Sequence, residues 1–141
     1  MGAHPILRLQ RWGTHEQERE WLPTSDEDLI QAVGTLASEF SAILVIEWAY
    51  DHWLAINASD ELFSVSVQLN EGAFHLIGNP AGTGKIPFIL GGQEIPHPRR
   101  YLVSLEQARA ASLEFFWTGT VDVANGTWER QGPQDAWRQE D

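Results

Sequence analysis

The chain contains no cysteine. This absence excludes disulfide bonds, thiolate metal sites and cysteine nucleophiles, and it fits a protein of a reducing compartment. Long hydrophobic runs are also missing, since no stretch approaches the roughly 18 uncharged apolar residues of a membrane-spanning helix. The first 21 residues mix arginine with glutamate and lack the apolar core of a signal peptide. We therefore expect a soluble, cytoplasmic protein.

Positive charge is missing from almost half of the chain. No lysine or arginine occurs between Arg19 and Lys85, and the formal net charge of the protein is -11. Such a field repels nucleic acid and anionic membranes, and it accelerates encounter with basic partners. An excess of charge that only maintains solubility is the alternative explanation. The acidic residues of this span are Glu20, Asp26, Glu27, Asp28, Glu39, Glu47, Asp51, Asp60, Glu61 and Glu71.

The motifs that would carry chemistry are incomplete. Residues 78–85 resemble a phosphate-binding loop, but Asn79 and Ile86 occupy the places of its first glycine and its Ser or Thr, and Pro87 prevents a following helix. The segment 15–19 has Arg19 where a zinc protease has its second histidine. We therefore predict no catalytic site, no metal and no cofactor.

The periodicity predicts one α+β domain over residues 25–130. Residues 1–24 are expected to form a peripheral arm or edge strand, and the polar tail 131–141 is expected to fray. Ser25 precedes an amphipathic helix with three acids in its first turn. Ser104 and Gln107 form a capping-box pattern for a second helix that ends before Gly119.

Between the helices the hydrophobic pattern changes to that of strands. We predict strands over 42–49, 53–57, 62–69 and 73–77, joined by short turns that allow only antiparallel neighbours. The Gly- and Pro-rich segment 79–98 is predicted as a long loop with at most one short strand, and residues 120–128 as a final strand. The expected fold is a largely antiparallel sheet of about five to six strands with two helices packed on one face.

Seven tryptophans divide into two groups. Four of them, Trp48, Trp53, Trp117 and Trp128, fall on predicted elements and are expected to fill the core. The others, Trp12, Trp21 and Trp137, lie in peripheral segments, where they either fold back onto the domain or serve as binding anchors.

A series of short motifs follows in a fixed order over about 50 residues of the C-terminal half. These motifs are Gly91-Gly92, Ile95-Pro96, Leu102-Val103-Ser104, the segment 105–111, Phe115-Phe116, Thr118-Gly119 and Trp128-Glu129. In this order they resemble the Imm-one family of toxin-immunity proteins. A departure occurs at Thr120-Val121-Asp122, where family members often carry Arg-Pro.

The resemblance implies a protein that binds a cognate secreted toxin and blocks its active site without chemistry of its own. Toxins of this kind include nucleic-acid deaminases and nucleases, whose substrates are anionic, so a basic toxin domain would complement the acidic span. The alternatives are an acidic regulatory or scaffold module that binds a basic host protein, and a small-ligand binder or enzyme that uses the loop 79–98 as a lid. The predicted partner-binding residues are Glu47, Asp51, His52, Trp53, Asp60, Glu61 and Glu71.

Overall fold

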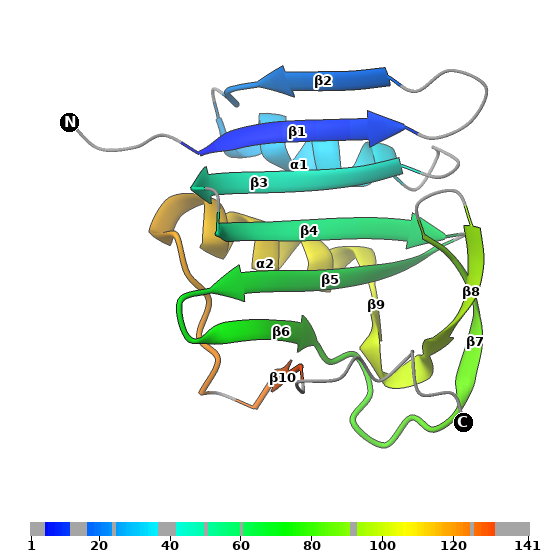
Figure 1. The fold of residues 1–141 in the computed structure, drawn as a ribbon. Coiled ribbons are helices and arrows are strands. Elements are labelled where there is room, and N and C mark those ends of the chain that lie inside the picture. Colours follow the sequence, from blue (N-terminus) through cyan, green and yellow to red (C-terminus); the bar gives the residue numbers. More distant parts are fainter. Residues whose placement is uncertain are drawn as a thin grey trace.

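A computed structural model describes residues 5–11, 17–23, 25–36, 42–49, 51–59, 61–90, 93–124 and 126–131. These residues form an eight-stranded sheet, a two-stranded sheet and two α-helices (Figure 1). The strands of the large sheet are β1 (Ile6–Arg11), β2 (Gln17–Trp21), β3 (Ala42–Ala49), β4 (His52–Ser59), β5 (Leu62–Leu69), β6 (Gly72–Leu76), β9 (Leu102–Val103) and β10 (Trp128–Arg130).

Neighbours in the large sheet are mostly neighbours in the chain. The strand order is β10-β6-β5-β4-β3-β1-β2, with β9 paired to β5, and every pair that the structure describes is antiparallel. Strands β3 to β6 form a meander because their connections are too short for a parallel return. The predicted antiparallel sheet is therefore confirmed.

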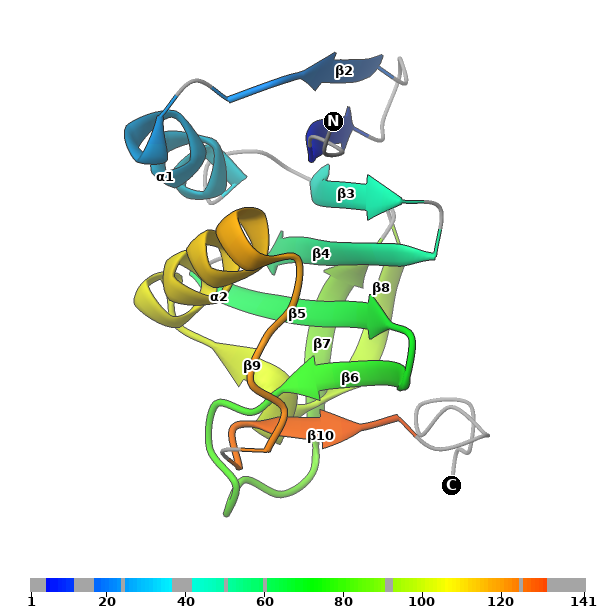
Figure 2. The same ribbon diagram turned by 90° about the vertical axis from the view of Figure 1, so that its left-hand side faces the viewer.

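Both helices, α1 (Asp26–Thr35) and α2 (Leu105–Thr118), cover the same face of this sheet (Figure 2). Each begins at a serine: the Ser25 hydroxyl accepts from the Asp28 N–H, and Ser104 and Gln107 form the predicted capping box. Within the described residues no helix is long and apolar enough to cross a membrane.

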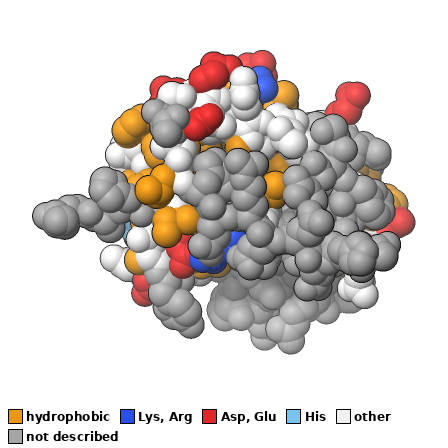
Figure 3. All heavy atoms as spheres, turned by 90° about the horizontal axis from the view of Figure 1, so that it is seen from above, with side chains coloured by type: hydrophobic (Ala, Val, Ile, Leu, Met, Phe, Trp, Pro, Cys, Tyr) orange, Lys and Arg blue, Asp and Glu red, His pale blue; other side chains and the backbone are white. Residues whose placement is uncertain are grey.

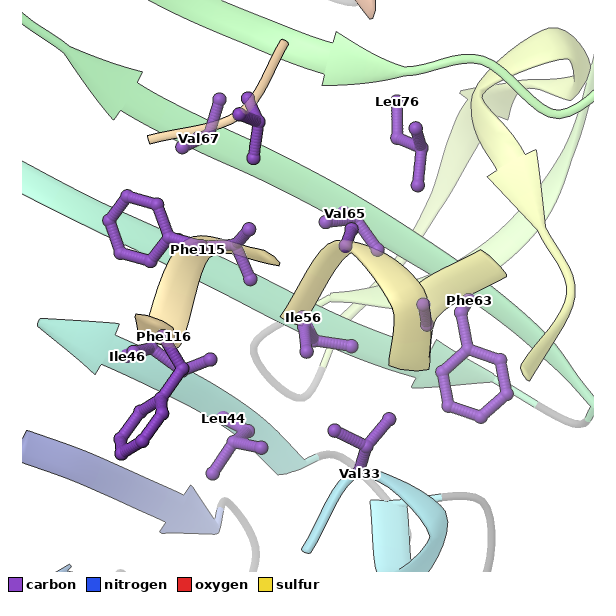
Figure 4. Close-up of a cluster of buried hydrophobic side chains, with 14 of the residues drawn as sticks. Val33, Leu44, Ile46, Ile56, Phe63, Val65, Val67, Leu76, Phe115 and Phe116 are labelled. Carbon is purple, nitrogen blue, oxygen red and sulfur yellow. The ribbon is translucent and has the colours of Figure 1, made fainter. Parts of the chain in front are cut away.

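The main core lies between the helices and the sheet. Alternate side chains of each strand point toward the helices, so that Leu44, Ile56 and Val65 stack across β3, β4 and β5 (Figure 4). Phe115 and Phe116 of α2 belong to the same buried cluster. A second, smaller core covers part of the opposite face.

That second core is built by a hairpin of β7 (Lys85–Leu90) and β8 (Gln93–Pro98), followed by a short 3-10 helix over Arg99–Tyr101. Phe88 and His97 stack with their ring centres 5.0 Å apart, and both are fully buried. Tyr101 meets His97 edge-on, with ring centres 6.4 Å apart, and stacks on His75 of β6 at 4.6 Å. Buried aromatic rings therefore attach the hairpin to the large sheet.

Three expectations from the sequence differ from the structure. Residues 1–24 contribute two paired strands: β2 is an edge strand, which is one of the two expected forms, but β1 lies inside the sheet, with Leu7 and Leu9 buried on its helix side. The segment 79–98 holds a hairpin, since a two-stranded sheet with free edges tolerates proline. Residues 120–127 form no strand over their described part, and β10 starts at Trp128.

Gly119 ends α2 in the left-handed conformation that the sequence predicts, with φ 76°. A Cβ there would lie 3.6 Å from the Trp48 ring, an ordinary contact, so the backbone alone opposes substitution. We expect Gly119→Ala to lower the free energy of unfolding by about 1–2 kcal/mol in urea denaturation. Gly119→Asn should lower it less, because asparagine tolerates this conformation. Equal losses for both variants would contradict this explanation.

Candidate binding surface

Two of the predicted binding residues, Glu47 and Trp53, face each other on β3 and β4. They lie on the side of the sheet away from the helices, and both are half-buried. The Glu47 carboxylate forms a salt bridge of 2.7 Å with Arg8 of β1. The charge of Glu47 is therefore already compensated within the domain, although no cation lies near it in the sequence.

His52 lies on the opposite side of the sheet from Trp53. Its ring stacks on Phe115, with centres 5.8 Å apart, and its Nε2 contacts the Gly119 carbonyl. The neighbouring Trp48 donates its indole N–H to the Phe115 carbonyl at 2.9 Å. These side chains hold the C-terminus of α2 against the turn between β3 and β4, so the structural role of His52 is clear.

The predicted turn residues separate into two groups at opposite ends of the sheet. Asp51 lies between β3 and β4 and Glu71 between β5 and β6, so the meander places both at one end, about 10 Å apart. Glu61 lies between β4 and β5, at the other end. All three are exposed, and among the described residues no cation pairs with them. Asp60 lies outside the described residues.

Trp117 is an exposed residue at the same end as Asp51. Its side chain is 61% exposed to solvent, and Leu22, in the connection between β2 and α1, is 56% exposed. The expectation that Trp117 fills the core is therefore wrong, whereas Trp128 is buried as expected and Trp48 and Trp53 are half-buried. Trp12, Trp137 and the side chain of Trp21 lie outside the described part of the chain.

The sequence does contain a signal for this exposure. Phe115, Phe116 and Trp117 are consecutive, and three consecutive helical positions span about 200°, which is wider than an apolar stripe of about 100°. One of the three must therefore face outward. Phe115 and Phe116 are buried, so the outward position falls to Trp117.

We call this region the acidic end. Its exposed acids are Asp26 and Glu27 of α1, with Asp51 and Glu71 in the turns. Seen from above, acidic and hydrophobic side chains lie next to one another along one edge of the molecule, with a Lys or Arg side chain beside them (Figure 3). Arg130 borders the acidic end beside Gly72, and its guanidinium lies 5.0 Å from the Phe74 ring centre.

The helix ends add to the negative potential here. The last turn of α2 contains no basic residue, so the partial negative charge of its C-terminus has no compensating side chain of its own. The first turn of α1 carries three acids, more than the partial positive charge of one helix end can neutralise. Electrostatics at the acidic end therefore favour a cation.

A second polar cluster lies under the hairpin. Arg100 donates two hydrogen bonds to Glu129, from Nε at 2.9 Å and from Nη2 at 2.6 Å. This contact lowers the pKa of Glu129 below its usual range and raises that of Arg100. Burial raises the pKa of the Tyr101 hydroxyl. Burial, assisted by the neighbouring His75, lowers the pKa of His97 to about 4, so His97 is uncharged at neutral pH.

A shallow pocket of about 230 Å³ borders this cluster and is lined by Gly84, Lys85, Pro98, Arg100 and Tyr101. Its volume is below the roughly 300–1,000 Å³ of typical small-molecule sites. Among the described residues, no group of three His, Asp or Glu side chains could hold a metal ion. The cluster joins β8, β6 and β10, so a structural role accounts for its hydrogen bonds.

Neither the protein-family models nor the curated proteins with which the chain was compared gave a match.

Proposed function

We propose that the chain is a binding protein that neutralises a basic protein partner by covering it, as an immunity protein does with its cognate toxin. The acidic end carries this proposal, because it combines uncompensated carboxylates with a large exposed aromatic ring. Exposed acids steer a basic partner toward the surface, and a rigid aromatic side chain supplies contact area at little entropic cost. The resemblance to the Imm-one family supports the same function.

Occlusion explains the inhibition without chemistry by this chain. A toxin that acts on nucleic acid needs a basic groove to hold its substrate, and a negatively charged surface seated in that groove excludes the substrate. Asp51 and Glu71 would contact the rim of the groove, where charges mainly affect the association rate.

The test is binding to the product of the neighbouring gene. The two proteins should co-purify after co-expression, and the purified complex should form at submicromolar concentration and suppress the toxicity of that product. Absence of binding at micromolar concentration, or turnover of a small molecule by this chain alone, would overturn the proposal. Binding to an unrelated basic host protein in its place would favour a regulatory or scaffold module.

Charge reversal decides which end of the sheet makes contact. We expect Asp51→Lys with Glu71→Lys to weaken binding about tenfold or more at low salt, mainly through slower association, with a smaller effect at high salt. The matched control is Asp60→Lys with Glu61→Lys, which changes the net charge equally at the other turn. Surface plasmon resonance at two salt concentrations measures both. A loss confined to the Asp60 and Glu61 pair would show that the acidic end is not the interface.

A further inference from the structure

The indole of Trp117 is held in one orientation although most of its surface is open to solvent. Its Nε1–H donates to the Asp26 Oδ1 at 2.6 Å, and its ring packs edge-on against Phe116 at 5.0 Å and 83°. Here a hydrogen bond between helices α1 and α2 fixes the ring before any partner arrives, which reduces the entropy lost on binding.

Within the described part of the chain, one oxygen of the Asp26 carboxylate is left without a hydrogen-bond donor beside this ring. Oδ1 accepts the indole proton, and among the described residues no donor is paired with Oδ2. Glu27 follows in the chain and is exposed, and the last turn of α2, which carries Trp117, has no basic residue. An aromatic face, a carboxylate oxygen and a negative helix end therefore meet in one place.

We propose that Trp117 and Asp26 form a site for one arginine side chain of the basic partner, an inference that rests on the proposed function. A planar guanidinium stacks on the face of an indole and donates in-plane hydrogen bonds to a carboxylate at the ring edge. The ammonium of lysine cannot make both contacts equally well. A purely apolar side chain would bury the second Asp26 oxygen, Oδ2, without a donor, which is unfavourable.

A titration that needs no partner tests the site directly. The probe is triarginine amide, with trilysine amide and triglutamate as comparisons, at low ionic strength. The observable is the indole Nε1–H signal of Trp117 in a ¹H–¹⁵N NMR spectrum, assigned by its disappearance in Trp117→Phe. We expect this signal to shift with triarginine, to shift less with trilysine and to remain unchanged with triglutamate. An unchanged chemical shift of this signal at millimolar triarginine would overturn the proposal.

Two variants test the roles of ring and carboxylate with the neighbouring gene product. Trp117→Ala should weaken binding about tenfold or more, as expected for a central aromatic contact. Asp26→Asn keeps an oxygen for the indole but removes the charge, and should weaken binding about threefold to tenfold. The matched controls at the other end of the sheet, Leu62→Ala and Glu61→Gln, should leave affinity unchanged. Thermal denaturation verifies that each variant is folded.

The outcomes separate this inference from the proposed function. If wild-type protein binds the neighbouring gene product and both variants bind it equally well, the arginine site is wrong while the proposed function stands. If triarginine shifts the Trp117 signal and the gene product does not bind, the site is supported and the proposed function fails.

Discussion

Phe115→Ala should lower the free energy of unfolding by about 3–5 kcal/mol, measured by urea denaturation. Phe115 is fully buried between α2 and the sheet, and His52 stacks on its ring. Removing the ring loses its transfer free energy and leaves a cavity that rigid neighbours, such as the strands β4 and β5, cannot fill. The loss is comparable to the whole stability of many domains of this size.

Trp117→Ala is the matched control for this prediction, because it removes a larger ring two residues further along the same helix. Since Trp117 is 61% exposed, its removal should change the free energy of unfolding by about 1 kcal/mol or less. In partner binding the order should reverse: Trp117→Ala should weaken binding more than Phe115→Ala does. A loss of stability for Trp117→Ala as large as that for Phe115→Ala would show that the exposed position of Trp117 is wrong.

Acidification should lower the free energy of unfolding by about 3 kcal/mol through the titration of His97 alone. Its pKa is lowered to about 4 in the folded protein, chiefly by burial and also by the neighbouring His75, whereas an unfolded histidine titrates near 6.5. Between these values the unfolded chain binds the proton and the folded chain does not. Stability is therefore fully present above pH 6.5 and falls as the pH drops toward 4.

Denaturation of wild type and His97→Phe at several pH values measures this effect. Phenylalanine preserves a ring beside Phe88 and Tyr101 but does not titrate, so the variant should lose less stability on acidification. The window from pH 6.5 to 5 is the most informative, since few carboxylates titrate there. Arg100 and Glu129 also face this cluster and keep their charges throughout the window. Parallel pH profiles for the two proteins would refute the role of His97.

Local sequence signals predicted the central architecture. The alternation of Phe63, Val65 and Val67 identified β5, and the capping box at Ser104 with the left-handed Gly119 identified both ends of α2. The hairpin β7–β8 could not be recognised because its prolines resemble those of a loop, and because its attachment to the large sheet depends on the contact of Tyr101 with His75 of β6. Only the tertiary structure shows that Tyr101 provides that contact.

The candidate surface was predictable in part. Asp51 and Glu71 share an end because alternate turns of a meander lie on the same side, which follows from the sequence pattern alone. The contact of Trp117 with Asp26 joins residues 91 positions apart and depends on how the two helices pack. Likewise, the salt bridge from Arg8 to Glu47 depends on β1 pairing with β3, which the irregular pattern of the first 24 residues did not reveal.

The late position of α2 in the chain has a consequence for synthesis. Strands β3 to β6 can pair as they leave the ribosome, because each lies beside the strand made just before it. The helix that covers much of their apolar face follows only at residues 105–118. A nascent or truncated chain that stops before Leu105 therefore carries a paired sheet whose hydrophobic side is covered by α1 alone, and the uncovered part is the kind of surface that aggregates or is held by chaperones.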